Sequence, residues 1–157
     1  VLIEIDVDMH RAGKSPDDPA VIEIARILHE GQHSEFSGVL THAGESYTCH
    51  TEEDLINAAE GERSLIVKAA NNIRAKGIPC SIISCGSTPT ATFAKNLNGV
   101  TEFRAGVYVF QDLFQSGRNV CEKDQLALSV LTTIISHKFH NYENNFTIDT
   151  CHCLYQF

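Results

Sequence analysis

The sequence predicts an α/β fold in which a parallel sheet is flanked by helices and followed by a smaller β region. Apolar stretches of strand length alternate with segments of helical periodicity up to about residue 117, and this alternation is typical of right-handed βαβ units. Residues 1–7 are mostly apolar, as expected for a strand buried on both faces. From residue 118 the helical periodicity is lost. We therefore expect one domain over residues 1–117 and the beginning of a β domain over residues 118–157.

The first forty residues predict two strands and one helix. Residues 1–7 give the first strand. Asp17-Asp18-Pro19 then combines an N-cap residue with a proline suited to the first helical turn, and the helix is expected to end near Gly31. Residues 36–41 give the second strand.

The middle of the chain repeats this order. The motif Thr51-Glu-Glu-Asp54 matches a capping box and opens a long helix towards Gly77. Residues 79–84 give the third strand, residues 90–97 a short helix, and residues 107–110 a fourth strand.

The last forty residues have a different pattern. Residues 126–136 are rich in β-branched side chains, and residues 146–149 follow a polar loop. Two such segments predict an antiparallel hairpin rather than another βαβ unit.

Composition excludes several classes of function. The chain has 157 residues, with 20 acidic against 12 basic side chains and a net charge of −8, which argues against a surface for nucleic acid or an anionic membrane. No apolar run reaches the ~18–20 residues that span a bilayer, and no secretory signal pattern opens the chain. The six cysteines are scattered, as expected for free thiols in a reducing compartment. These features predict a cytoplasmic protein.

Small and polar residues gather where the predicted strands end. They occupy residues 6–11, 41–47, 84–90 and 104–107. In parallel sheets ligands bind at the carboxyl ends of the strands. The Gly-Ser-Thr-Pro-Thr turn within residues 84–90 suits a phosphate, because its backbone N–H groups are unobstructed. Ordinary helix capping by Ser or Thr explains the same residues, and both interpretations stay open at this point.

Two further groups allow a chemical or a structural interpretation. His137 and His140 with Cys151 and Cys153 offer zinc ligands, but their spacing is poor for a zinc finger, which favours a solvated loop. Cys85 lies beside the glycine turn and could be a reactive thiol. A small buried residue that closes the strand is the favoured interpretation.

Four motifs together resemble a known family. They are Glu4-Ile-Asp-Val-Asp-Met-His-Arg-Ala-Gly13, Gly38-Val-Leu-Thr-His-Ala-Gly-Glu-Ser-Tyr47, Ser87-Thr-Pro-Thr90 and Val100-Thr-Glu-Phe-Arg-Ala-Gly-Val-Tyr-Val-Phe-Gln-Asp112. In this order they resemble the D-serine dehydratase and D-threonine aldolase family, over residues 1–149. The resemblance implies the alanine-racemase fold, in which a TIM-type (β/α) barrel precedes a β domain, and pyridoxal 5'-phosphate as cofactor. The chain is expected to hold part of that barrel.

The resemblance also implies which residues bind the cofactor. Arg11 resembles the arginine close to the cofactor ring, Tyr47 resembles a cofactor-binding tyrosine, and His42 lies on the same strand-end segment, where it could face the ring.

On the phosphate side, Thr88 resembles the threonine that binds phosphate, and Gly86 and Ser87 would lend further donors. Gly106 and Val107 match a second phosphate turn, in which a backbone N–H would be the donor. We expect Thr88 and this second turn to meet at one end of the sheet.

The implied activity is that of a lyase acting on β-hydroxy D-amino acids, as a dehydratase or an aldolase. The sequence departs from the family at Asp8, Leu40, Glu45 and Val107. The family's Schiff-base lysine is expected upstream of this sequence and its zinc or manganese ligands downstream, so no catalytic or metal residue is assigned here. The alternative is a catalytically inactive, truncated remnant that only binds cofactor or a partner. The resemblance is compatible with a homodimer of the complete enzyme.

Overall fold

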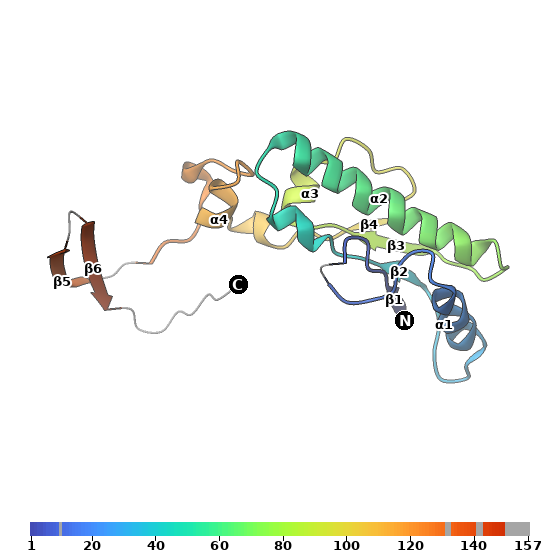
Figure 1. Cartoon of the computed structure of the whole chain (residues 1–157). Coiled ribbons are helices and arrows are strands. Elements are labelled where there is room, and N and C mark those ends of the chain that lie inside the picture. Colours follow the sequence, from blue (N-terminus) through green and yellow to red (C-terminus); the bar gives the residue numbers. More distant parts are fainter. Residues whose placement is uncertain (10, 131–132, 141–142, 150–157) are drawn as a thin grey trace. The chain divides into compact units, whose positions relative to one another are not determined.

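The computed structural model describes residues 1–9, 11–130, 133–140 and 143–149 (Figure 1). The chain divides into two compact units, Val1–Ala127 and Leu128–Phe157, and each is considered on its own. The sequence predicted a domain boundary ten residues earlier. Residues 118–127 belong to the first unit, where Arg118 donates to the Cys49 carbonyl and the Ala127 amide donates to the Phe110 carbonyl. The proposed boundary between domains stays a prediction.

The first unit is built on a four-stranded parallel sheet. Its strands are β1 (Leu2–Glu4), β2 (Gly38–Leu40), β3 (Ile82–Cys85) and β4 (Glu102–Phe103), and they lie side by side in this order. Ile3, Val39 and Ile83 share one register row. The predicted parallel pairing of the first two strands is confirmed.

The predicted fourth strand is wrong in position. Residues 107–110 do not form a strand: Val107–Val109 is a 3-10 helix, η2, and the fourth strand is Glu102–Phe103. Sheet pairing ends when the Arg104 amide donates to the Cys85 carbonyl, 2.7 Å away, and the chain then turns. The side chains of Tyr108, Val109 and Phe110 are 58%, 55% and 52% exposed, so this apolar run is not a buried strand.

The two longer helices follow the predicted signals. Helix α1 (Pro19–Glu30) begins after Asp18, whose carboxylate accepts from the Ala20 amide. Helix α2 (Glu52–Arg74) begins after Thr51, whose hydroxyl accepts from the Asp54 amide. Gly61 does not interrupt α2, which runs along the sheet in Figure 1.

The shorter elements were predicted less well. Helix α3 (Thr88–Phe93) begins two residues earlier than expected, because Ser87 and Thr90 form a reciprocal capping box. The 3-10 helices η1 (Gly44–Tyr47) and η3 (Lys123–Gln125) and the short helix α4 (Leu113–Ser116) were not predicted. All these elements except η3 lie next to the ends of strands or to η2, where chain direction is set by turns rather than by hydrophobic periodicity.

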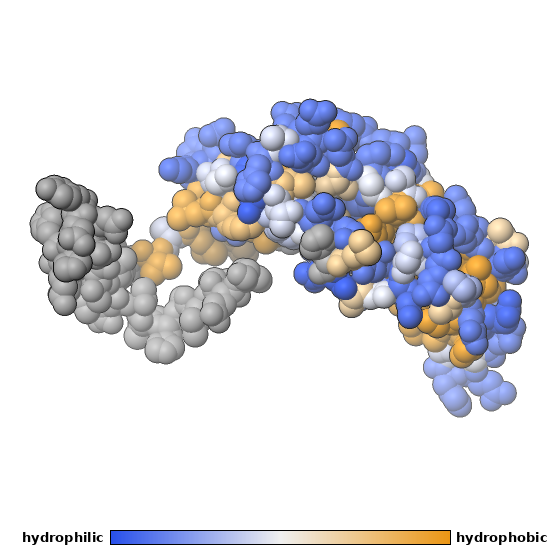
Figure 2. Space-filling view, in the orientation of Figure 1, coloured by the Kyte–Doolittle hydropathy of each residue, from blue (hydrophilic) through white to orange (hydrophobic). Residues whose placement is uncertain are grey.

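One face of the sheet packs against the helices and forms the core. Alternate strand residues contact an apolar stripe of α1 and α2, and this cluster includes Ile3, Ile5, Val39, Ile83, Cys85, Val21, Ala25, Ile66, Ala69, Ala70 and Ile73. The outer side of α2 is hydrophilic in Figure 2, as expected for an amphipathic helix. An apolar patch covers the region of η2 and α4 in the same view. In the part of the chain that the structure describes, no helix has the length and apolar character needed to cross a bilayer.

The second unit contains an antiparallel pair of strands, β5 (Thr133–His140) and β6 (Glu143–Asp149). The predicted hairpin is confirmed, although its first strand starts at Thr133 and not near residue 126. The pairing register shifts between Ile134 and Ser136.

Candidate functional site

Buried polar side chains are concentrated near the carboxyl ends of the strands in the first unit. In a water-excluded position each such group needs a hydrogen-bond partner. The members of this cluster, each at most 2% exposed, are Thr41, Ser46, Glu62, Ser84, Ser87, Thr88 and Thr90. Within this strand-end layer, side-chain hydrogen bonds join Ser46, Ser87, Thr90 and Glu62, so the turns at the predicted edge of the sheet are not independent of one another.

Glu62 lies at the centre of this layer. Its side chain comes from α2 and is 2% exposed. Oε1 accepts from the Ala43 amide at 2.9 Å and the Gly86 amide at 3.1 Å, and Oε2 accepts from the Thr90 hydroxyl at 2.9 Å. Sequence reasoning missed Glu62. The signal was present, because Glu62 occupies the apolar stripe of the helix, between Ala59 and Ile66.

The turn after β3 is held by helix capping. The Thr90 amide donates to the Ser87 hydroxyl, and the Ser87 amide donates to the Thr90 hydroxyl at 3.0 Å. The Ser87 hydroxyl also lies 3.0 Å from that of Ser46. The capping interpretation is thus confirmed. Since the Gly86 and Ser87 amides already donate within the protein, their role as direct phosphate donors stays a prediction.

Gly86 is a position that only glycine fits. Its φ is +117°, and a Cβ atom there would lie 2.3 Å from Cε1 of Phe103. Its carbonyl oxygen lies 3.2 Å from Nδ1 of His42. A carbonyl can only accept, so this contact places the proton of neutral His42 on Nδ1 and leaves Nε2 as an acceptor.

The three residues predicted on the ring side belong to one neighbourhood. His42 and Tyr47 stack with ring centroids 5.7 Å apart and an angle of 26° between planes. Burial raises the pKa of the Tyr47 hydroxyl, and the positive charge of Arg11 opposes this rise, so Arg11 is within electrostatic range of Tyr47. Tyr47 in turn contacts the ring of Phe114.

The two predicted phosphate turns meet. The Tyr108 amide donates to Oγ1 of Thr88 at 3.1 Å, and Tyr108 follows directly after Gly106 and Val107. Thr88 keeps its own hydroxyl proton for donation. A Cβ atom built on Gly106 would meet no atom within 4 Å, so its backbone is open on that side. The juxtaposition is as expected, and the binding of an anion there stays a prediction.

Arg104, which follows β4, links the ends of β2 and β3. Its Nε donates to the Ser84 hydroxyl at 2.8 Å, and Nη2 donates to the Thr41 carbonyl. The Thr41 hydroxyl donates to the carbonyl of Ile5 at 2.6 Å. Sequence reasoning placed Arg104 at the correct edge but gave it no role.

Cys85, Asp6 and Asp8 each have a structural role. The Cys85 side chain is fully buried, and burial, reinforced by the charge of Glu62, raises its pKa to about 12. It is therefore a packing residue and not a reactive thiol. Asp6 accepts from the Met9 amide, and Asp8 accepts from the Glu45 amide at 2.7 Å.

A cavity of about 410 Å³ lies beside this layer but is not the predicted cofactor site. Glu62 forms one of its walls, and Asp8, Glu45 and Asp54 line the rest together with apolar groups. None of the predicted cofactor residues lines it. Four carboxylates would repel a phosphate.

No lysine or metal site was found among the described side chains. Lys14, Lys68 and Lys95 are at least half exposed and lie near Asp18, Asp17 and Glu52, respectively. No three His, Cys, Asp or Glu side chains in the described ranges could hold a metal ion. Of the weak zinc candidates, the two cysteines of the tail fall outside the described residues.

Comparison with known proteins agrees with this geometry. The alanine racemase N-terminal domain family matches residues 1–113. The D-threo-3-hydroxyaspartate dehydratase of Delftia sp. (strain HT23) is 52% identical over 139 residues, which cover 88% of this chain and 36% of that enzyme. The solved structure of that enzyme superposes with a TM-score of 0.84.

Two other relatives carry the names that the sequence motifs suggested. The D-serine dehydratase of Dictyostelium discoideum is 30% identical over 87% of this chain and 36% of its own length. The D-threonine aldolase of Arthrobacter sp. is 30% identical over 71% of this chain and 29% of its own length. The predicted resemblance is confirmed, and the chain spans about a third of the length of these relatives.

Proposed function

This chain belongs to the alanine racemase N-terminal domain family, and from that membership we propose that it forms the cofactor-binding part of a pyridoxal-phosphate-dependent lyase acting on β-hydroxy D-amino acids. Its four parallel strands are part of a TIM-like barrel. One observation carries the proposal: the Thr88–Tyr108 hydrogen bond joins the two predicted phosphate turns. The contact between the Gly86 carbonyl and His42 extends this arrangement to the stacked rings of His42 and Tyr47.

The donor set fits pyridoxal phosphate. The phosphate would be held by the Thr88 hydroxyl and the backbone of Gly106 and Val107, because hydroxyl and amide donors suit a dianion. The stacked rings of His42 and Tyr47 present aromatic surface for a planar ring. When bound, the cofactor supplies an electron sink for the substrate's α-carbon.

The ring-side residues have separate tasks in this proposal. A tyrosine is protonated at neutral pH at its ordinary pKa of 10.0, and burial raises the pKa of Tyr47 further, so its hydroxyl can donate a hydrogen bond. His42 is fixed by Gly86 with Nε2 free to accept a proton. Arg11 supplies positive charge beside them and would orient an anionic group of the substrate or cofactor.

The names of the relatives define the proposed substrate class. D-threo-3-hydroxyaspartate, D-serine and D-threonine all carry a hydroxyl on the β-carbon. The higher identity to a dehydratase, 52% against 30% for the aldolase, favours loss of the hydroxyl over cleavage of a carbon–carbon bond. One D-threo-3-hydroxyaspartate dehydratase variant is described as being in a metal-free form, which supports a metal in the complete enzyme, and we propose a divalent ion, zinc or manganese. A homodimer and a cytoplasmic location remain part of the proposal.

Cofactor titration tests this function. The full chain is titrated with pyridoxal phosphate, with pyridoxal lacking the phosphate as comparison, and absorbance and fluorescence are recorded. We expect saturable binding that favours the phosphorylated form. Thr88→Val should raise the Kd for pyridoxal phosphate at least about tenfold, because it removes a hydrogen bond to a charged group. Thr92→Val is the matched control, since its hydroxyl donates to the Thr88 carbonyl and not to the Thr88 side chain.

Two outcomes separate the proposal from its alternatives. Equal affinity for pyridoxal and pyridoxal phosphate, or none for either, would contradict it. Borohydride reduction and mass spectrometry then test covalent attachment. The exposed lysines described above lie in solvent and not in the enclosed site that a Schiff-base lysine needs, so no stoichiometric adduct is expected on them. Release of ammonia from D-threo-3-hydroxyaspartate or D-serine would exclude the inactive-remnant alternative.

A further inference from the structure

We propose that Glu62 is the positioning residue of the cofactor site, a single buried carboxylate that fixes residues 41–47 and residues 86–90 in one arrangement. The effect on cofactor affinity rests on the proposed function. The coupling between the two segments rests on geometry alone.

The carboxylate is stabilised by donors from the segments that it joins. Burying a charged group is costly unless it is well hydrogen-bonded. Glu62 receives three hydrogen bonds of 2.9–3.1 Å, from Ala43, Gly86 and Thr90. No cation within the described ranges forms an ion pair with it. The apolar stripe of α2 does not itself require a carboxylate at this position. The carboxylate of Glu62 therefore stabilises the segments after the strands rather than the helix.

Each donor leads directly to a predicted cofactor residue. Ala43 follows His42, so the bond to its amide fixes the start of the segment that ends at Tyr47. The bond from the Gly86 amide orients the peptide plane next to the carbonyl that receives His42. The bond from Thr90 holds the cap of α3, whose first residue is Thr88.

The ring side and the phosphate side therefore share one anchor. Ala43 and Gly86 donate to the same oxygen atom, Oε1, although they are 43 positions apart in the sequence. If the carboxylate is removed, both amides lose their acceptor at once. A loss confined to one side is not compatible with this arrangement.

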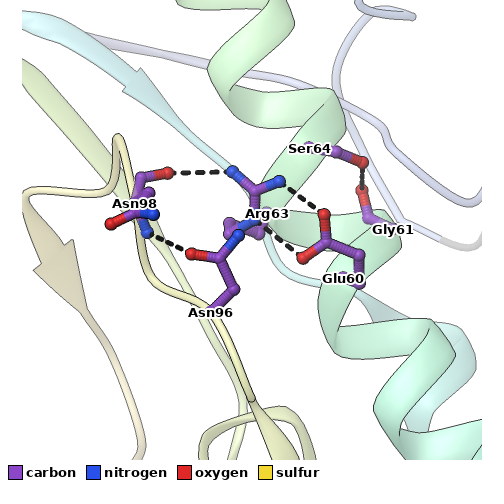
Figure 3. Close-up of polar contacts among 6 residues, drawn as sticks. All are labelled: Glu60, Gly61, Arg63, Ser64, Asn96 and Asn98. Atoms are coloured by element: carbon purple, nitrogen blue, oxygen red, sulfur yellow. Dashed lines mark hydrogen bonds and ion pairs between the residues drawn. The ribbon is translucent and has the colours of Figure 1, made fainter.

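Glu60 provides a matched control on the same helix. It lies two positions before Glu62, on the outer face, and its carboxylate binds the Arg63 guanidinium (Figure 3). Arg63 also donates to the Asn98 carbonyl at 2.8 Å, so this cluster ties the loop after α3 to α2. Among the described residues, the hydrogen bonds of Glu60 and Arg63 reach no side chain of the strand-end layer.

The test compares four variants of the full chain. Glu62→Ala and Glu62→Gln change the anchor, Glu60→Gln changes the exposed carboxylate, and Ile73→Val lowers core stability at the far end of α2. All are measured below their unfolding temperatures. The readouts are the Kd for pyridoxal phosphate, the Kd for inorganic phosphate, and hydrogen exchange of peptides that contain Ala43 and Gly86.

We expect Glu62→Ala to raise the Kd for pyridoxal phosphate at least about tenfold, the scale of a lost hydrogen bond to a charged group. Exchange should accelerate in both peptides. Glu62→Gln should recover most of the affinity, because its carbonyl oxygen can still accept from Ala43 and Gly86. Glu60→Gln should change none of the three readouts, and Ile73→Val should lower Tm without raising either Kd.

Several results would overturn the proposal. A folded Glu62→Ala variant with wild-type affinity would do so, as would faster exchange in only one peptide or an equal loss of affinity in Ile73→Val. If Glu62→Ala does not fold, Glu62→Gln must show faster exchange in its Thr90 segment and a smaller but measurable rise in Kd. If the wild-type chain binds no pyridoxal phosphate, the proposed function fails. Whether Glu62 couples the two segments is then decided by hydrogen exchange alone, which should accelerate in both peptides of Glu62→Ala.

Discussion

The helix-facing core and the strand-end layer of the first unit are both buried but have opposite chemistry. In the core, Ile3, Val39 and Ile83 are at most 7% exposed and contact apolar residues of the helices. In the strand-end layer, Thr41 and Thr88 are equally buried but hydrogen-bonded. Apolar burial stabilises the fold, whereas polar burial yields little net stability. The comparison indicates that the core stabilises the fold, whereas the strand-end layer fixes the relative positions of the segments that follow the strands.

Helix α2 takes part in both regions. Most of its buried positions are apolar and belong to the core side, such as Ile66 and Ile73. Glu62 is the buried charged position in the described part of the same helix. One amphipathic helix thus supplies both the packing surface and the anchor of the site, so a displacement of α2 would affect both.

Substitution in the core gives the largest expected effect on stability. Ile83→Ala should lower the free energy of unfolding by about 2–5 kcal/mol, because Ile83 is fully buried and its removal leaves a cavity. The Kd for pyridoxal phosphate, measured well below Tm, should stay unchanged. Urea unfolding and cofactor titration are the measurements. Ile82→Ala, on the half-buried opposite face of the same strand, should cost clearly less, and an equal cost would contradict the distinction between the two faces.

Gly86→Ala should affect both regions. Alanine at a φ of +117° is strained, and its Cβ would meet the Phe103 ring, so we expect a loss of about 2–4 kcal/mol in unfolding free energy. Cofactor affinity should fall as well, because the carbonyl that holds His42 would move. Gly61→Ala is the matched control. A Cβ there meets no atom, and helix propensity predicts a gain of up to about 1 kcal/mol. The same sign for both variants in urea unfolding would refute this prediction.

The fold was largely predictable because hydrophobic periodicity records burial. The strands around Ile3, Val39 and Ile83 and the helices after Asp18 and Thr51 follow from such patterns. The fourth strand did not, because residues 107–110 have strand-like composition but lie at the surface. Only pairing with β3 shows that Glu102–Phe103 is the strand.

The site was predictable in part. Short motifs placed Thr88, Tyr47 and the second turn at one edge, and the structure brings Thr88 and this turn into contact. Glu62 and Arg104 were not recognised as site residues, because their importance depends on contacts between distant segments. A single charge within an apolar helical stripe is visible in the sequence, but its partners are not.

The smallest expected effect concerns Cys85, which lies where the two regions meet. Burial and the nearby charge of Glu62 raise its pKa to about 12, whereas an unfolded cysteine titrates near 9.0. The folded state therefore keeps a proton that the unfolded state releases. Its contribution to stability is complete below about pH 9 and decreases as pH rises towards 12. Linkage predicts a loss of about 1 kcal/mol between pH 9 and pH 10 from this thiol.

Comparison of the wild-type chain with Cys85→Ala isolates this contribution. Cys80 and Cys121 are also buried with raised pKa values, so both proteins should lose stability at high pH, and only the difference reports on Cys85. Urea unfolding at pH 7, 9 and 10 gives that difference. We expect the stability advantage of the wild type to shrink between pH 9 and 10, because Cys85→Ala lacks the titrating group. A constant difference between the two proteins would mean that the Cys85 thiol has an ordinary pKa. In that case water would reach β3 at the strand-end layer. The burial on which the comparison of the two regions depends would then be wrong.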